Sequence, residues 1–184
     1  MAQDRLENKL KKNFKKKLGV LGGTFDPAHI GHVKISLEAK KKFRINKVIW
    51  AITKKNPFKK KRLFSLNKRI EIAKKITSKK KFIEVYFFEK KIKSDKTIKL
   101  INYLKKKYNN TDIYFLMGAD NLINFHKWVG WKDISQKCNI LVFDRHGYKK
   151  NSLKSKTFRA IGSTTLKFIE FSKVNISSSQ LRKI

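Results

Sequence analysis

An eleven-residue stretch near the start of the chain most constrains its fold: Gly22-Gly23-Thr24-Phe25-Asp26-Pro27-Ala28-His29-Ile30-Gly31-His32. It follows the apolar run Leu18 to Leu21 and precedes apolar residues at helical spacing, Ile30, Val33 and Leu37. A strand, a glycine turn and a helix start in this order suit a phosphate, because the helix N-terminus attracts anions. We expect the paired glycines to allow a backbone geometry and a close approach that a side chain would block.

Two histidines, His29 and His32, stand three residues apart at the start of the expected helix, so they should share one face. Such a pair could also ligate a metal, but tetrahedral sites need three or four ligands. The chain has neither a His-Glu-x-x-His pattern nor a cysteine cluster, and we therefore predict no metal site. The spacing of the stretch also differs from the dinucleotide-binding fingerprint and from the Walker P-loop.

Charge is the most unusual feature of the composition. The 184 residues include 47 Lys and Arg against 13 Asp and Glu, which gives a net charge of +34, whereas 12% aromatic residues indicate a real core. This charge alone would predict binding to nucleic acid or to an anionic surface. However, the lysines are scattered over the solvent-facing stretches, and abundant Lys, Ile, Asn and Phe are expected from AT-rich coding DNA. We therefore expect no specific nucleic-acid partner.

The chain also carries indications of its compartment. Cys138 is the single cysteine, which excludes an internal disulfide and fits a reducing compartment. No apolar run approaches the roughly 20 residues that span a bilayer. The basic segment 1–17 lacks the apolar core of a signal peptide. We expect a cytoplasmic protein without a membrane partner, while the sequence leaves the oligomeric state open.

Strands and helices are expected to alternate along the chain. The expected strands are 18–21, 47–52, 82–88, 113–117, 140–143 and 166–171. The expected helices are 30–43, 65–77, 97–107, a short one around Leu122 and a last one from Ser177, with loops at 90–96 and 149–157. This alternation predicts an α/β fold, a Rossmann-like, doubly wound, mainly parallel sheet with helices on both faces. We expect a basic N-terminal extension, 1–17, followed by a single domain, 18–184.

The glycine-histidine stretch resembles the signature of the nucleotidylyltransferases, a Thr or Ser near a strand end followed by His-x-Gly-His. With its Gly-Gly-Thr-Phe-Asp-Pro lead-in it looks like the nicotinate-nucleotide adenylyltransferase branch. A second stretch, Ile176-Ser177-Ser178-Ser179-Gln180-Leu181-Arg182, resembles the family's C-terminal Ile-Ser-Ser-(Ser/Thr)-x-(Ile/Leu)-Arg motif. Taken alone, this second stretch could be a serine-rich helix cap with an unrelated arginine.

Further segments extend the resemblance from Leu18 to Arg182. Gly118-Ala119-Asp120, followed by Trp128, is similar to the family's Gly-x-Asp segment and pyridine-stacking Trp, whereas we assign Trp131 to the core and give His126 no catalytic role. Two other matches are Asn56-Pro57-Phe58-Lys59 for the substrate loop and Arg145-His146-Gly147-Tyr148 for a segment near the adenine. Ser94-Asp95-Lys96-Thr97 matches the family's Ser-Tyr-Thr motif only loosely, because the Tyr is missing.

The resemblance implies a transferase of NAD biosynthesis that converts ATP and nicotinic acid mononucleotide to nicotinic acid adenine dinucleotide and pyrophosphate. It implies that His32 stabilises the α-phosphate in the transition state, that His29 orients the phosphates and that Thr24 lies near the incoming phosphate. The implied ATP-binding residues are Gly22, Gly23, His29, His32, Arg145, Ser178, Ser179 and Arg182. The implied substrate-binding residues are Thr24, Lys59, Thr97, Asp120 and Trp128. Mg²⁺ would arrive with ATP.

Two alternatives stay open at this point. One is another enzyme of the superfamily, such as phosphopantetheine adenylyltransferase or a cytidylyltransferase. The other is a basic RNA-binding protein on a relict nucleotide-binding fold.

Overall fold

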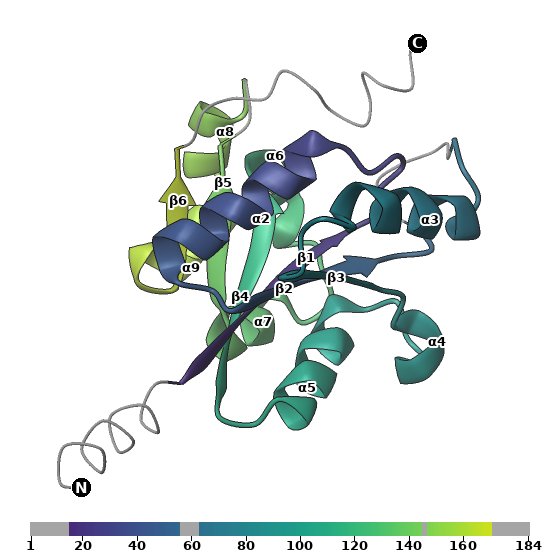
Figure 1. Ribbon diagram of the computed structural model, residues 1–184. Coiled ribbons are helices and arrows are strands. Elements are labelled where there is room, and N and C mark those ends of the chain that lie inside the picture. Colours follow the sequence, from purple (N-terminus) through teal and green to yellow (C-terminus); the bar gives the residue numbers. More distant parts are fainter. Residues whose placement is uncertain (1–14, 56–62, 145–146, 171–184) are drawn as a thin grey trace, which may run out of the picture.

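One parallel sheet forms the centre of the molecule (Figure 1). The computed structural model describes residues 15–55, 63–144 and 147–170. Within these residues six strands pair in the order β3-β2-β1-β4-β5-β6, all of them parallel. Their bounds are β1 Lys16–Gly23, β2 Lys47–Ile52, β3 Ile83–Tyr86, β4 Thr111–Gly118, β5 Asn139–Phe143 and β6 Leu166–Ile169. The predicted doubly wound α/β fold is confirmed.

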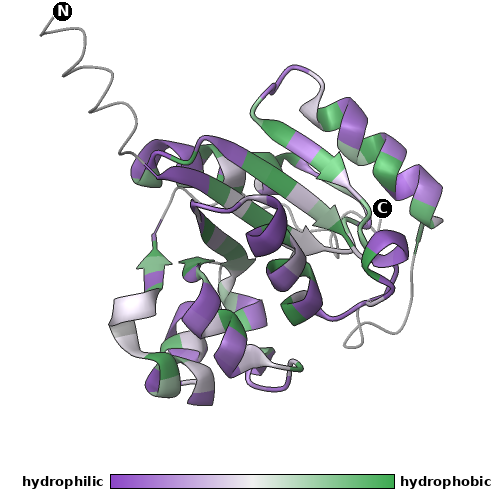
Figure 2. Cartoon of the chain, turned by 90° about the horizontal axis from the view of Figure 1, so that it is seen from below, coloured by the Kyte–Doolittle hydropathy of each residue, from purple (hydrophilic) through white to green (hydrophobic). Residues whose placement is uncertain are grey.

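Helices cover both faces of the sheet, and they alternate hydrophilic and hydrophobic residues along their length (Figures 1 and 2). One face carries α2 Ile30–Phe43 and α3 Leu66–Thr77, and the other carries α5 Thr97–Lys107, α6 Ala119–Phe125 and α7 Trp131–Lys137. Shorter or peripheral helices are α4 Glu89–Ile92, α8 Lys149–Leu153 and α9 Lys156–Thr165. None of the helices in the described residues is long and apolar enough to cross a membrane.

Two apolar cores, one on each face, explain why the strands read as continuous apolar runs. On β1, Val20 packs with α5, α6 and α7, while the next residue, Leu21, packs with α2 and α3. Both side chains are at most 5% exposed, and each contributes roughly 1.5–3 kcal/mol on burial. Trp50 on β2 is fully buried in the second core. The alternation fixes the register of each strand, because a slip of one residue would exchange the two faces.

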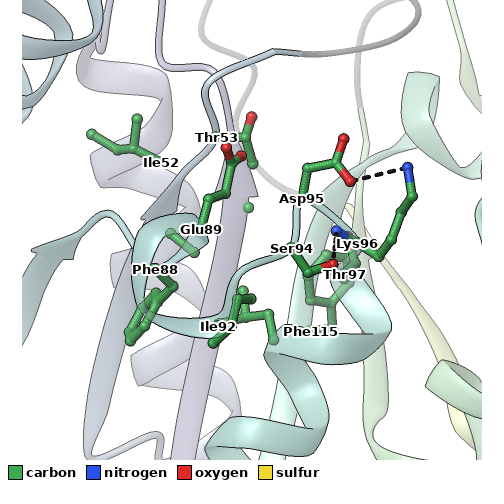
Figure 3. Close-up of a pocket in the computed structure, with 13 residues that line it drawn as sticks. Ile52, Thr53, Phe88, Glu89, Ile92, Ser94, Asp95, Lys96, Thr97 and Phe115 are labelled. Atoms are coloured by element: carbon green, nitrogen blue, oxygen red, sulfur yellow. Dashed lines mark hydrogen bonds and ion pairs between the residues drawn. The ribbon is translucent and has the colours of Figure 1, made fainter.

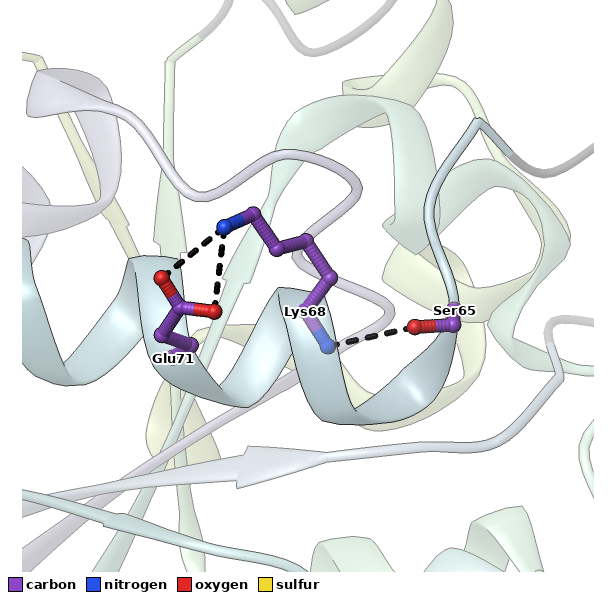
Figure 4. Close-up of polar contacts among 3 residues, drawn as sticks. All are labelled: Ser65, Lys68 and Glu71. Atoms are coloured by element: carbon purple, nitrogen blue, oxygen red, sulfur yellow. Dashed lines mark hydrogen bonds and ion pairs between the residues drawn. The ribbon is translucent and has the colours of Figure 1, made fainter.

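One helix cap expected from the sequence is present. The predicted N-cap Ser65 accepts a hydrogen bond from the Lys68 backbone N–H at 3.3 Å (Figure 4). On the same exposed turn, the Lys68 ammonium pairs with the Glu71 carboxylate at 2.9 Å (Figure 4). Such caps satisfy N–H groups that the helix itself leaves unpaired.

The expectation of a polar surface loop at 149–157 is wrong. Helix α8 and the start of α9 occupy these residues, and Ser152 and Thr157 are fully buried. Ser155 caps α9 by accepting from the Phe158 N–H at 3.2 Å, and Thr157 Oγ1 accepts from the His126 N–H at 3.1 Å. These hydroxyls are therefore buried with partners, which a polar composition does not reveal.

Smaller differences concern boundaries. Helix α4 forms within the expected loop 90–96, and β1 begins at Lys16, two residues before the expected start of the domain. The expected helix from Ser177 and residue 171 of the last expected strand lie outside the described residues.

The strand order places a crevice between β1 and β4. From β1 the chain proceeds outward to β2 and β3, and it then crosses over to β4 and proceeds to β5 and β6 on the other side. Ligands of such sheets bind at the carboxyl ends of the strands where this order reverses. Gly23 ends β1 and Gly118 ends β4, so the glycine-histidine stretch and the Gly-x-Asp segment meet at this point.

Candidate functional site

The turn after β1 has a constrained backbone, but the constraint does not lie in its glycines. A Cβ on Gly22 would meet the Phe115 ring at 3.5 Å and one on Gly23 the Phe25 ring at 3.6 Å, both ordinary contacts. The residue with a left-handed backbone is Phe25, with φ of +47°. Such a conformation in a bulky residue is strained and persists only when the surroundings impose it. The special backbone geometry expected at the paired glycines is therefore found at Phe25 instead, whereas their close approach to a phosphate stays a prediction.

His29 and His32 cap α2 reciprocally. The Gly31 N–H donates to Nδ1 of His29 at 3.1 Å, and the His29 N–H donates to Nδ1 of His32 at 3.2 Å. The two ring centroids are 4.0 Å apart. This is the capping-box arrangement, built from two imidazoles instead of the usual hydroxyl and carboxylate. Because Nδ1 accepts in both rings, the proton of each neutral imidazole resides on Nε2.

An aromatic support holds the His32 ring. The centroid of Phe25 lies 4.7 Å from that of His32, and Phe25 in turn stacks on Trp50 at 4.9 Å. The indole N–H of Trp50 donates to Ser36 Oγ at 2.8 Å, and this hydroxyl donates to the His32 carbonyl at 2.9 Å. All three supporting side chains are at most 2% exposed. They explain how the left-handed Phe25 is imposed, because its ring fills the space between α2 and β2.

Two buried charged residues anchor the same turn. The carboxylate of Asp26 accepts from the N–H groups of Leu63 at 2.9 Å and Phe64 at 3.0 Å. Arg69 on α3 is fully buried, and its Nη1 donates to the Thr24 carbonyl at 2.6 Å. The turn is thus joined to the segment that opens α3 from both sides.

A pocket of about 380 Å³, open to solvent, lies beside the end of β1. Its polar lining includes Thr53, Glu89, Ser94 and Thr97, while residues such as Phe115 form an apolar wall. Figure 3 shows Glu89 and Thr53 on one side of the pocket and Ser94 and Thr97 on the other. An apolar pocket with a few convergent polar groups is the usual form of a small-molecule site.

Glu89 has an altered acidity. Burial raises the pKa of its carboxyl group, and the hydrogen bond from the Lys54 N–H, 2.9 Å long, opposes this rise. The neighbouring Asp95 carboxylate also raises the pKa of Glu89. Asp95 itself pairs with Lys96 at 3.0 Å, and that contact lowers the pKa of Asp95.

The side chain of Asp120 lies close to the backbone of Gly118. A Cβ on Gly118 would lie 2.5 Å from Oδ1 of Asp120, closer than real side chains approach. That oxygen is buried at the start of α6. A side chain at position 118 would therefore displace the Asp120 carboxylate at the end of β4.

Trp128 stands behind the pocket wall. Its ring meets Phe115 edge-on at 6.1 Å and Phe125 at 5.2 Å. Trp131, assigned to the core from the sequence, packs partly buried against Phe125 at 6.3 Å.

The described residues thus bring together one group of the sequence-predicted site residues. Thr24, His29 and His32 share the turn, and Gly22 and Thr97 line the pocket beside it. Asp120 lies at the adjacent strand end, and Trp128 packs against the wall residue Phe115. Their roles stay predictions. Five further predicted residues lie outside the described residues: Lys59, Arg145, Ser178, Ser179 and Arg182.

Several residues of the site were not found from the sequence. The sequence shows Phe25 as a member of the motif and Trp50 as a member of a buried strand, with no sign that their rings stack. Arg69 and Glu89 received no role, since a single charged residue on an amphipathic helix or at a strand end resembles any surface residue. Only the backbone carbonyls and N–H groups that they bind in the fold distinguish them.

Comparison with known proteins shows the family of the chain. The family model described as cytidylyltransferase-like matches residues 20–184. A protein of Pelagibacter ubique named "Probable nicotinate-nucleotide adenylyltransferase" is 60% identical over 178 residues, which cover 97% of this chain and 98% of the relative. The chain belongs to the nicotinate-nucleotide adenylyltransferase family. A member with the same name from Clostridium perfringens (strain SM101) is 35% identical over 173 residues, 91% of this chain and 85% of the relative.

Solved structures of this family share the fold. Nicotinic acid mononucleotide adenylyltransferase of Plasmodium falciparum, complexed with NaAD, superposes with a TM-score of 0.73 at 21% identity. The alignment covers 91% of this chain and 83% of the other, and the complex with APC gives the same values. The predicted family and enzyme class, a nucleotidyltransferase, are confirmed.

Proposed function

We propose that this chain transfers the adenylyl group of ATP to nicotinic acid mononucleotide, giving nicotinic acid adenine dinucleotide and pyrophosphate. The observation that carries the proposal is the reciprocal capping of His29 and His32 at the switch point of the sheet, beside a pocket that is open to solvent. The names of the relatives point to the same reaction, and the Plasmodium falciparum homologue was solved with NaAD.

The reaction needs positioning more than it needs acid or base catalysis. A phosphate oxygen of the mononucleotide forms a bond to the α-phosphorus of ATP, and the bond from that phosphorus to the bridging oxygen of pyrophosphate breaks. The nucleophile is already an anion, so the protein has no proton to remove. Its task is to hold two polyanions in line and to stabilise charge that develops on the phosphoryl oxygens.

The two imidazoles suit this task. Backbone N–H groups donate to Nδ1 of both His29 and His32, which places the proton of each neutral ring on Nε2, the atom that we propose as the donor to a phosphate. The His32 ring is fixed by Phe25 and Trp50, so its donor is preorganised before substrate binds. The N-terminus of α2, a helix of 14 residues, adds its N–H groups and its dipole.

The pocket suits the mononucleotide. Phe115 in its wall offers an apolar surface to a pyridine ring, and a few polar groups lie beside that surface. Thr97 opens α5, whose N-terminal N–H groups favour a carboxylate, and no side chain caps this end. Trp128 contributes through Phe115, against which it packs.

ATP is expected as its magnesium complex. Mg²⁺ is bound in such sites by substrate phosphates with few protein ligands. In the described part of the chain, no group of three or more His, Cys, Asp or Glu is placed to hold a metal. The carboxylate nearest the turn, Asp26, accepts two backbone hydrogen bonds and serves the fold.

Pyrophosphate release tests the proposal. The purified chain is given Mg-ATP or Mg-CTP together with nicotinic acid mononucleotide, nicotinamide mononucleotide or phosphopantetheine, and the products are identified by mass spectrometry. We expect release with ATP and the nicotinic acid mononucleotide, and a dinucleotide product in equal amount. Turnover with phosphopantetheine alone, or with CTP in preference to ATP, would contradict the proposal.

A further inference from the structure

Arg69 is an unusual residue for the interior of a small domain. It lies on α3 and is fully buried, although burying a cation is costly unless hydrogen bonds compensate. An apolar side chain of similar volume would fill the same space without that cost. The retained guanidinium therefore suggests a use for its planar set of donors.

Its described partners are backbone carbonyls from three segments. Nη1 donates to Thr24 at 2.6 Å and to Thr53 at 2.8 Å, and Nη2 donates to Lys54 at 3.2 Å. Nε donates to Phe64 at 3.3 Å, just before α3. One side chain thus joins the turn after β1, the end of β2 and the start of α3.

These contacts continue into the pocket. The Lys54 backbone is held at both of its polar groups, because its carbonyl accepts from Arg69 and its N–H donates to Glu89. Thr53 and Glu89 both line the pocket. Arg69 therefore links the phosphate turn to the wall of the pocket through a side chain, beside the backbone bond from the Thr53 N–H to the Gly23 carbonyl at 2.9 Å.

We propose that Arg69 is a positioning residue that sets the phosphate turn and the mononucleotide pocket in the relation that in-line transfer requires. The inference rests on the proposed function, because the turn and the pocket hold the two reactants. A rigid guanidinium fixes both segments at once, and a flexible ammonium cannot contact all of these carbonyls in the same planar arrangement. The proposal predicts an effect on alignment, and not on the affinity for either reactant alone.

The test uses Arg69→Lys, with Lys68→Met as the matched control. Lys68 is the neighbouring cation on α3, but its side chain pairs with the exposed Glu71 (Figure 4). For Arg69→Lys we expect kcat to fall by about 10²-fold, as for a misplacement of about 1 Å, with both KM values within about threefold of wild type. Lys68→Met should keep the wild-type kcat.

Equilibrium binding gives a second measurement that does not depend on turnover. The product dinucleotide occupies both halves of the site through one covalent link, so its affinity depends on their mutual placement. Arg69→Lys should bind ATP and the mononucleotide as wild type does, and the dinucleotide about tenfold or more weakly. A generally loosened fold would instead weaken all three ligands together.

Chemical rescue covers the case in which Arg69→Lys does not fold. Guanidinium ion at low millimolar concentration should restore kcat to Arg69→Ala, whereas urea or sodium chloride should not. If neither variant folds, with or without guanidinium, Arg69 serves folding and the positioning role is overturned.

The remaining outcomes are distinguishable. Wild-type kcat and dinucleotide affinity in a folded Arg69→Lys protein would overturn the role of Arg69 and leave the proposed function intact. An equal loss in Lys68→Met would also overturn it. A wild-type chain that neither turns over nor binds the dinucleotide would overturn the proposed function, and this role with it.

Discussion

Replacing His32 by asparagine separates two tasks that the structure gives to one imidazole. Its Nδ1 caps α2 by accepting from the His29 N–H at 3.2 Å, and its Nε2–H is the proposed donor to the α-phosphate. An asparagine Oδ1 is attached to Cγ as Nδ1 is, so it can accept the same hydrogen bond. The variant keeps the cap and loses the donor.

The expected magnitudes differ between His32→Asn and His32→Ala. Both lose the ring contact with Phe25, centroids 4.7 Å apart, which is worth about 0.5–1.5 kcal/mol of stability. Only the alanine variant also leaves the His29 N–H without its acceptor, at a further cost of about 1 kcal/mol. Both variants lose one preorganised donor, which lowers kcat by about 10²–10³-fold.

The assay pairs urea unfolding with pyrophosphate release for both variants. We expect His32→Asn to be more stable than His32→Ala and to be equally slow. The complementary variant, His32→Gln, places an amide N–H near the Nε2 position without the Nδ1 acceptor, so it should keep more turnover than His32→Asn. The reasoning is refuted if a folded His32→Asn protein turns over at nearly the wild-type rate, or if turnover in the three variants simply follows stability.

Three further predictions concern other groups of the site. Gly118→Ala places a methyl group 2.5 Å from Asp120 Oδ1. We expect kcat/KM to fall at least about tenfold and the free energy of unfolding in urea to fall by about 1 kcal/mol. Unchanged kinetics would speak against a role for Asp120. Because burial raises the pKa of Glu89 in the folded chain, its ionisation opposes folding, and stability should fall as pH rises from the ordinary glutamate pKa through the raised one. Unfolding curves of Glu89→Gln should lack this part of the pH dependence. The enzyme should prefer nicotinic acid mononucleotide over its amide by about 10- to 10³-fold in kcat/KM, because the amide cannot make the hydrogen bonds that a charged carboxylate accepts. A ratio near one would contradict the placement of the carboxylate near Thr97.

Most of the fold could be predicted from the periodicity of apolar residues and from the residues at turns. The alternation of apolar runs with helical patterns predicted the parallel sheet, and the bounds of α2, β2 and α5 agree with those expected from the sequence. These elements have strong local signals, namely a 3.6-residue apolar spacing or a short apolar run. The prediction of a loop at 149–157 is wrong because the hydroxyl groups of this segment are buried and hydrogen-bonded, and the partner of Thr157, His126, lies far away in the sequence.

In the candidate site, too, local sequence features could be predicted and tertiary contacts could not. The motif indicated the turn and its histidines, yet not that the histidines cap each other or that Phe25 carries the left-handed backbone. Arg69 was invisible in the sequence, because a buried cation bound to backbone carbonyls leaves no pattern of side-chain types. Supports of this kind arise from tertiary contacts, and only coordinates reveal them.

The central claim is that the mononucleotide phosphate attacks the α-phosphorus of ATP directly. The most direct measurement uses nicotinic acid mononucleotide whose phosphate oxygens are labelled with ¹⁸O, followed by mass spectrometry of both products. We expect all of the label in the dinucleotide and none in the pyrophosphate. Label in the pyrophosphate, or release of AMP in place of a labelled dinucleotide, would contradict the claim.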